Sequence, residues 1–192
     1  MPPVVDVPGL TYEADYLRPD EQAALLECID REPWRDDLRR RVQHYGYRYD
    51  YRRRTVGRES YLGPLPGWAE DCAERLRRDG YADQRLDQLI VNEYLPGQGI
   101  APHVDCVPCF GDAVLSLSLG SACVLTMSRP EAGADRRVPV LLEPGGLLVM
   151  RGEARYEWRH GIAARKTDRY DERTVVRARR VSLTFRSVLA AD

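Results

Sequence analysis

The pattern of apolar and polar positions divides the chain into an early helical part and a later part rich in strands. Between about residues 19 and 31, apolar residues recur at the spacing of an amphipathic helix, after acidic residues in the first turn. A second stretch, from Trp68 to Arg78, has the same spacing and ends before Gly80. From Leu86 onward apolar residues alternate with polar ones or form short runs, which is typical of β-strands.

Seven strand-like runs follow, bounded by glycine, proline and charged turns. They cover residues 88–94, 114–119, 123–127, 138–142, 147–150, 156–160 and 175–188. Many short strands at regular spacing, preceded by two helices that can cover the outside, predict a mainly β, α+β fold with a jelly-roll core, a double-stranded β-helix. At 192 residues the chain has the size of one domain. We expect a single domain over 1–192, with the helices and a lid in about 1–85 and the jelly roll in about 86–189.

A basic segment rich in tyrosine, residues 39–54, lies between the two predicted helices. Tyrosine occupies every second position from Tyr45 to Tyr51, which predicts a strand or hairpin with one aromatic face and arginines on the other. From Arg35 to Arg58 there are nine arginines against three aspartates. Aromatic rings for base stacking and arginines for phosphates suit a flap that binds nucleic acid, and we call residues 39–54 the lid segment. The alternative is that the tyrosines pack on the core and the arginines form a solvated face.

Composition limits the classes of function. A net charge of -1 excludes a uniformly basic protein that coats nucleic acid, so any contact with nucleic acid is focal. Five cysteines, odd in number and scattered, do not form a disulfide framework, and we interpret the pair Cys106 and Cys109 as incidental rather than as a zinc or redox site. The first residues lack the basic region and apolar core that are typical of a signal peptide, and no apolar run approaches membrane-spanning length. We therefore expect a cytoplasmic monomer with no membrane partner.

His103 and Asp105 form the strongest candidate for a metal site. Two positions apart on a strand, their side chains project the same way and can bind one ion together. An isolated His-x-Asp is usually a surface pair, so a third ligand is needed. Of the two other histidines, His160 follows several strand-like runs and suits a facing strand, whereas we interpret His44 as part of the lid or the structure. Two histidines and one carboxylate are the ligand set of non-haem Fe(II) oxygenases.

A second cluster of polar residues lies near the end of the chain. Arg180, Ser182, Thr184 and Arg186 alternate with apolar residues and would share one face of a strand. Burying two arginines and two hydroxyls is costly unless a dianion lies between them. The pattern therefore predicts a binding site for a small dianion.

These motifs occur in a family order: Asn-x-Tyr-x-x-Gly from Asn92, His-x-Asp, a distant histidine, and Arg-x-Ser-x-Thr-x-Arg. In this order they resemble the AlkB family of Fe(II)- and 2-oxoglutarate-dependent dioxygenases, from about residue 41 to about residue 187. The blocks at residues 116–120 and 152–156 are specific to this resemblance. Within the family, residues 42–47, 94–100 and 147–153 look nearest to the oxygenases that hydroxylate the wobble uridine of eukaryotic tRNA.

The resemblance implies a set of site residues and cofactors. Fe(II) would be held by His103, Asp105 and His160, with 2-oxoglutarate and O2 as co-substrates. The implied 2-oxoglutarate residues are Asn92, Tyr94, Arg180, Ser182, Thr184 and Arg186, with Arg180 and Tyr94 at the far carboxylate and Asn92 and Arg186 at the iron-side end. Ser182 stands where many members carry asparagine. The implied substrate contacts are Tyr45, Tyr47, Tyr49 and Arg52 in the lid, together with Arg129.

The resemblance leaves the reaction open between two outcomes. The first is oxidative dealkylation of an alkylated base in DNA or RNA, with release of succinate, CO2 and an aldehyde. The alternative is hydroxylation of a modified tRNA base, which leaves a stable alcohol. Val107 stands where repair-type members carry an acidic residue, which weakens the first. A hydroxylase of a small molecule or protein on the same scaffold, and a non-enzymatic β-sandwich binding module, are the rival hypotheses.

Overall fold

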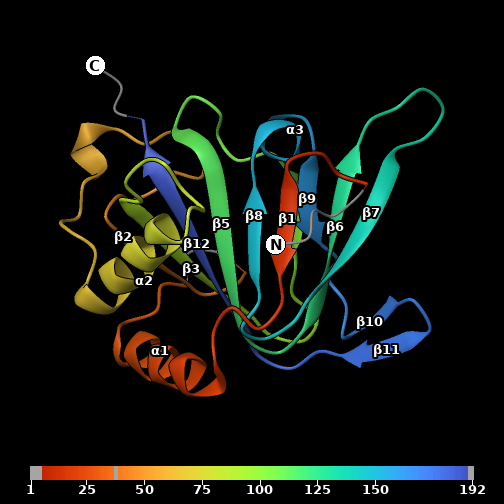
Figure 1. The fold of residues 1–192 in the computed structure, drawn as a ribbon, viewed down its shortest axis with the longest axis horizontal. Coiled ribbons are helices and arrows are strands. Elements are labelled where there is room, and N and C mark those ends of the chain that lie inside the picture. Colours follow the sequence, from red (N-terminus) through yellow and green to blue (C-terminus); the bar gives the residue numbers. More distant parts are fainter. Residues whose placement is uncertain (1–5, 37–38, 190–192) are drawn as a thin grey trace.

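The computed structural model describes residues 6–36 and 39–189, which form two main antiparallel sheets, a two-stranded hairpin and three α-helices (Figure 1). The larger sheet has six strands in the order β1 (Leu10–Glu13), β8 (Leu147–Met150), β5 (Phe110–Gly120), β12 (Arg180–Val188), β3 (Gln88–Tyr94) and β2 (Val42–Tyr45). The smaller has four, in the order β4 (Ile100–His103), β9 (Arg159–Ile162), β6 (Cys123–Arg129) and β7 (Arg136–Leu142). The predicted mainly β jelly roll with flanking helices is confirmed.

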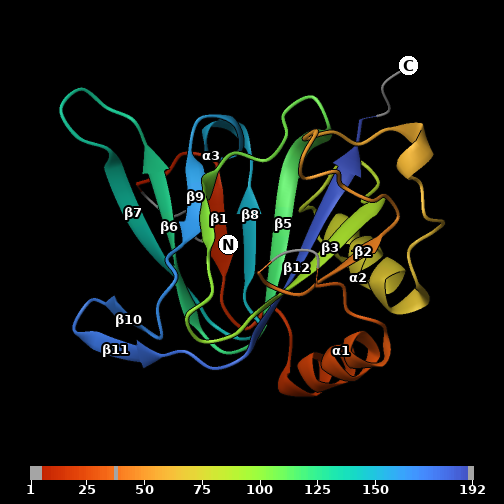
Figure 2. The same cartoon turned by 180° about the vertical axis from the view of Figure 1, so that it is seen from behind.

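The first part of the chain contributes to the larger sheet as well as to the helices. Strand β1 pairs with β8, and β2 pairs with β3. A separate hairpin, β10 (Thr167–Tyr170) and β11 (Arg173–Val176), projects away from both sheets in the two opposite views (Figures 1 and 2). The larger sheet therefore contains strands from both sides of the predicted boundary near residue 85.

Helices α1 (Pro19–Arg31) and α2 (Gly67–Arg78) cover the outer face of the larger sheet, beside β2, β3 and β12 (Figure 1). Helix α1 buries Leu25 and Ile29, and α2 buries Leu76, in one apolar cluster with the outward residues of the sheet. These apolar stripes are the ones that the helical spacing predicts. In the described part of the chain, no helix has the length and apolar character needed to cross a membrane.

Strand β12 shows how the period-two pattern creates the site. Val181, Leu183 and Phe185 belong to the cluster under the helices. Since successive side chains point to opposite faces, Arg180 and Arg186 project to the inner side of the sheet, toward the smaller sheet. The inner sides of the two sheets share a second apolar cluster, which leaves the polar residues of β12 at the edge of a cavity.

Three of the predicted elements are wrong in their detail. Residues 156–160 do not form one strand, because a short helix α3 (Gly152–Tyr156) precedes β9. The run 175–188 is divided into β11 and β12. The tyrosine-rich segment is regular only in β2, because Gly46 has a positive φ of 74° and lies against the main chain of Asp87, where an added Cβ would come within 1.8 Å of a carbonyl oxygen.

Candidate metal centre and co-substrate cavity

A cavity of about 550 Å³ lies between the two sheets and contains the predicted metal ligands and co-substrate residues. Its volume is in the usual range for small-molecule sites. All nine of those residues line it: Asn92, Tyr94, His103, Asp105, His160, Arg180, Ser182, Thr184 and Arg186. The period-two pattern on β3 and β12 therefore brings together residues that are far apart in the sequence.

Two neighbouring strands and one loop position the three candidate metal ligands. His103 ends β4 and is paired in register with His160 on β9. Asp105 is not on the strand, as its spacing predicted, but in the loop that follows. Each of the three offers one ligand atom, and these atoms all lie within 4.8 Å of one another. Among the described residues, this is the group that the structure brings together for one ion, and His44 is not part of it.

Hydrogen bonds and burial hold each ligand in the form that a metal requires. Nδ1 of His103 donates to the carbonyl oxygen of Ala101 at 2.9 Å, which leaves the Nε2 lone pair available. Burial opposes the charge of Asp105, but the positive charge of Arg186 prevails and lowers its pKa to about 2. Burial, followed by repulsion from His103, lowers the pKa of His160 to about 4. At neutral pH the site therefore offers a neutral imidazole at His160 and a carboxylate at Asp105.

Arg186 orients the carboxylate of Asp105, one of the three candidate metal ligands. Its Nη1 donates to Oδ1 of Asp105 at 2.9 Å, and the other oxygen, Oδ2, lies 3.7 Å from Nε2 of His160. The guanidinium carbon of Arg186 also lies 4.3 Å from the centroid of the Phe110 ring. One carboxylate oxygen is thus held by Arg186, and the second is directed at the histidines.

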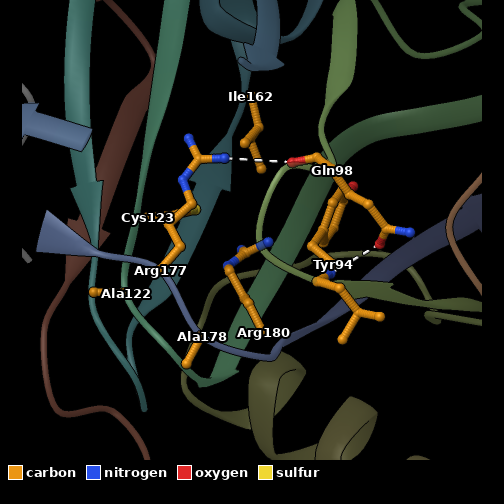
Figure 3. Close-up of a pocket in the computed structure, with 9 residues that line it drawn as sticks. Tyr94, Gln98, Ala122, Cys123, Ile162, Arg177, Ala178 and Arg180 are labelled. Carbon is orange, nitrogen blue, oxygen red and sulfur yellow. Dashed lines mark hydrogen bonds between the residues drawn. The ribbon is translucent and has the colours of Figure 1, made fainter. Parts of the chain in front are cut away.

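The other end of the cavity is formed by Arg180 and Tyr94. Arg180 is 3% exposed, its Nη2 donates to Ser118 Oγ at 2.8 Å, and its guanidinium carbon lies 5.5 Å from the centroid of the Tyr94 ring. Figure 3 shows both side chains beside a small hollow, where Arg177 donates to the carbonyl oxygen of Gln98. A buried arginine beside a phenol is a suitable partner for a carboxylate.

Two unsatisfied donors test whether the cavity fits a dianion. Nε of Arg180 and Nε of Arg186 are both buried and have no hydrogen-bond partner among the described residues. Leaving such donors unpaired is costly, and the carboxylates of 2-oxoglutarate would supply acceptors at both ends of β12. Two imidazoles and a carboxylate likewise suit ferrous iron. The residues present therefore fit both groups.

Of the remaining co-substrate residues, Ser182 and Asn92 have hydrogen-bond partners within the cavity. The hydroxyl oxygens of Ser182 and Ser116 are 2.9 Å apart. Oδ1 of Asn92 accepts a hydrogen bond from Nε of Arg40 at 2.9 Å. Thr184 lines the cavity and is partly buried.

Of the five predicted substrate contacts, only Tyr49 lines the cavity. Tyr45 points to the outer side, where its ring lies 5.5 Å from that of Trp68, and Tyr47 packs on Tyr61 at 5.0 Å. The physical reason is the turn at Gly46, which interrupts the alternation on which the prediction depended.

The two predicted arginine contacts also lie outside the cavity lining. Arg52 is exposed. Arg129 forms ion pairs with Glu153 at 2.8 Å and Glu157 at 3.1 Å, so its charge is neutralised by α3 and the residue after it. Neither residue supports the prediction of a substrate contact.

Sequence reasoning missed several residues of the cavity. They are Arg39, Arg40, Tyr51, Arg54 and Ser116. Tyr51 belongs to the same tyrosine series as Tyr49, and Ser116 faces the cavity with the period of β5, so both had a signal in the sequence. The arginines had no such signal. The sequence alone does not show which of the nine arginines in this segment reach the cavity, because that depends on the path of the chain.

Cys106 and Cys109 are joined by a disulfide in the loop after Asp105, which corrects the interpretation of this pair as incidental. Cys106 lines the cavity, and its Sγ lies 3.2 Å from the carbonyl oxygen of Arg54 in the lid segment. Both cysteines belong to a small apolar cluster with Val56 and Phe110. The disulfide thus lies where the lid meets the loop of the candidate metal site. Cys28, Cys72 and Cys123 are free.

A family model and several curated proteins match this chain. The model of the 2OG-Fe(II) oxygenase superfamily matches residues 9–186. The tRNA (carboxymethyluridine(34)-5-O)-methyltransferase ALKBH8 of Macaca fascicularis is 39% identical over 172 residues, which is 84% of this chain and 25% of that protein. The alkylated DNA repair protein ALKBH8 homolog of Arabidopsis thaliana is 35% identical over 205 residues, covering 96% of this chain and 59% of that protein. The chain thus spans a quarter to three fifths of the length of these relatives.

Solved structures resemble the fold. The structure of OsALKBH1 has a TM-score of 0.64 and 20% sequence identity, and the match covers 93% of this chain and 96% of that one. At this identity the likeness concerns the fold alone.

Proposed function

Because the chain belongs to the 2OG-Fe(II) oxygenase superfamily, as an AlkB-type dioxygenase that uses Fe(II), 2-oxoglutarate and O2, we propose that it oxidises a substituent on a base of DNA or RNA. The observation that carries the proposal is that one cavity is lined both by the His-Asp-His group with the β12 arginines and by tyrosines and arginines of the lid segment. It has room for a co-substrate and a base together.

In this proposal His103, Asp105 and His160 hold the ferrous ion, and Arg180 with Tyr94 holds the far carboxylate of 2-oxoglutarate. Bound iron and 2-oxoglutarate supply, with O2, the oxidant that converts a C–H bond to C–OH, while 2-oxoglutarate becomes succinate and CO2. Arg186 keeps Asp105 ionised and oriented, and its free Nε is available to the co-substrate. The apolar residues around the centre, among them Leu125 and Met150, limit the access of water.

The lid side of the cavity suits a base. The rings of Tyr49 and Tyr51 lie 5.1 Å apart in an edge-to-face arrangement, and Tyr49 is supported by Phe110 at 5.8 Å. A ring fixed from behind offers its other surface for stacking, which contributes about 1–3 kcal/mol per base. Arg39, Arg40 and Arg54 beside these tyrosines supply positive charge for flanking phosphates.

Charge favours a neutral or anionic base over a cationic one. Among the described residues that line the cavity, five are arginines and one, Asp105, is acidic. Adenine methylated at N1 and cytosine methylated at N3 carry a positive charge, which these arginines would repel. Val107, where an acidic residue would contact such a base, is exposed and apolar.

Of the two outcomes, the charge of the cavity therefore favours hydroxylation of a modified tRNA base over dealkylation of a cationic base. The macaque relative is named for a tRNA carboxymethyluridine, which also supports a tRNA substrate. The fate of the product depends on the atom next to the oxidised carbon. Oxidation beside nitrogen ends in loss of an aldehyde, and oxidation beside carbon leaves an alcohol.

One experiment tests both outcomes. The protein is incubated with Fe(II), 2-oxoglutarate and O2 and a panel of oligonucleotides that carry either N-alkylated bases or uridines substituted at carbon. Formaldehyde from the first set indicates dealkylation, and the gain of one oxygen atom in the second indicates hydroxylation. If activity is confined to a free small molecule or a protein and is unaffected by salt, the nucleic-acid proposal is wrong, since binding to nucleic acid weakens steeply as salt rises.

A further inference from the structure

Arg155 is a buried cation to which the proposed reaction assigns no role. It belongs to the short helix α3, five positions before His160, and is 2% exposed. Burial lowers its pKa, so the fold retains this charge at a cost. A buried arginine is expected to pair with a carboxylate, but the four hydrogen-bond acceptors of Arg155 are all main-chain carbonyl oxygens.

These four carbonyls lie within residues 105–111, which comprise the loop after β4 and the first two residues of β5. Nη1 of Arg155 donates to the carbonyl oxygen of Asp105 at 3.0 Å, and Nη2 donates to those of Cys106 at 3.3 Å and Phe110 at 3.4 Å. Nε donates to the carbonyl oxygen of Gly111 at 3.2 Å. This part of the chain therefore curls around the guanidinium, which donates hydrogen bonds to four of its main-chain carbonyl oxygens.

Arg155 itself is held by its neighbours in the chain. The amide of Ala154 donates to the carbonyl oxygen of Pro8 at 2.9 Å, and that of Trp158 donates to the carbonyl oxygen of Glu153 at 3.1 Å. Trp158 is 1% exposed and lies two positions before His160. The side chain of Arg155 thus links the segment that carries His160 to the loop that carries Asp105.

We propose that Arg155 is a positioning residue for the metal centre: its guanidinium fixes the main chain at Asp105 and so sets the distance between the Asp105 carboxylate and His160. Asp105 is then held at both ends, since Arg186 binds its carboxylate and Arg155 its carbonyl oxygen. This inference rests on the proposed role of His103, Asp105 and His160 as metal ligands. Residues that orient metal ligands through hydrogen bonds typically raise metal affinity by about 10- to 100-fold.

The test measures metal binding in the absence of turnover. Co(II), which is stable in air, is titrated into the full-length protein and followed by calorimetry and by its visible absorption. The variants are Arg155→Lys, which keeps the charge but cannot reach four acceptors, and Arg155→Gln, which removes the charge. Arg159→Gln, an exposed arginine on β9 beside His160, is the matched control. His103→Ala shows whether Co(II) binds at the candidate metal site, because removing this ligand should abolish the calorimetric and absorption signals.

The expected result is Co(II) binding about 10- to 100-fold weaker, with an altered visible spectrum, in both Arg155 variants and unchanged binding in the control. A similar loss in the lysine variant would assign the effect to the forked hydrogen bonds rather than to charge. A folded Arg155→Lys or Arg155→Gln protein that is less stable to heat but binds Co(II) with wild-type affinity and spectrum would overturn the inference. If Arg155→Gln does not fold, the lysine variant decides alone. Wild-type protein that binds no Co(II) would instead overturn the metal site, and the inference with it.

Discussion

Arg186 donates to Asp105 at 2.9 Å, although the two residues are 81 positions apart in the chain. The resemblance assigned Arg186 to the iron-side end of the co-substrate, and the structure adds a contact with the candidate metal carboxylate. Since Nε of Arg186 has no hydrogen-bond partner in the described part of the chain, one guanidinium has donors for both groups. Metal binding and co-substrate binding are therefore expected to depend on one another through this side chain.

Arg180, unlike Arg186, has no hydrogen bond to a candidate metal ligand among the described residues, because it lies beside Tyr94 and donates to Ser118. Arg180→Met should raise the KM for 2-oxoglutarate by about 30- to 150-fold, the equivalent of about 2–3 kcal/mol for lost hydrogen bonds to a charged group. Binding of Fe(II) or Co(II) alone should change little. Steady-state kinetics and metal titration check the two parts, and an equal loss in both would contradict the assigned role.

Arg186→Met is predicted to damage both steps. Removing the guanidinium leaves the Asp105 carboxylate without its donor and the co-substrate without its second cation, so metal affinity and 2-oxoglutarate affinity should both fall about tenfold or more. The measurement is the same pair of titrations. A variant that loses affinity for 2-oxoglutarate alone would show that the contact with Asp105 is unimportant for the metal.

Substitutions at two tyrosines of the lid segment distinguish a role in substrate binding from a role in packing. Tyr49→Ala should raise the KM for an oligonucleotide by about 5- to 100-fold, because a stacking surface of about 1–3 kcal/mol is lost, without changing the KM for 2-oxoglutarate. Tyr45→Ala is the control, since this ring packs on Trp68 outside the cavity and its loss should lower thermal stability instead. If both substitutions raise the oligonucleotide KM equally, Tyr49 has no specific role.

The buried carboxylate of Glu93 predicts how stability depends on pH. Its side chain is 1% exposed and accepts hydrogen bonds from Arg41 and Arg179, and these bonds, led by that of Arg41, hold its pKa below the ordinary value of 4.5. Because the pKa is lower in the folded protein, this stabilisation is present above about pH 4.5 and is lost as the pH falls through the lowered pKa.

Glu93→Gln should therefore reduce the free energy of unfolding by about 2–3 kcal/mol at pH 7 and make it less dependent on pH in the acid range. Urea unfolding at several pH values measures this. Glu27→Gln, in an exposed pair with Arg31, should cost less than about 1 kcal/mol. Equal effects of the two substitutions would show that burial of Glu93 contributes nothing.

The parts of the site that follow from strand periodicity could be predicted from the sequence. Alternation on β3 and β12 assigns Asn92, Tyr94, Arg180 and Arg186 to one face, because a strand has only two faces. Contacts made by long side chains across the fold could not be predicted. Arg155 lies within a predicted family block, but its four acceptors depend on the path of a loop 44 or more positions away.

The strand predicted for the tyrosine-rich lid segment was wrong for a related reason. The tyrosine series from Tyr45 to Tyr51 has a clear period of two, but that period has meaning only while the chain stays extended. The positive φ of Gly46 ends the strand, so Tyr49 reaches the cavity and Tyr45 does not. The glycine was visible in the sequence, whereas its conformation depends on close contact with Asp87, which belongs to a distant segment.

The central claim is that two histidines and one aspartate hold a ferrous ion that couples 2-oxoglutarate to the oxidation of a base. The most direct measurement is succinate formed with Fe(II), 2-oxoglutarate, O2 and a substrate oligonucleotide, compared between the wild-type protein and His103→Ala. We predict one succinate for each base oxidised by the wild type and none by the variant. Full turnover by His103→Ala, or no succinate from the wild type, would contradict the account.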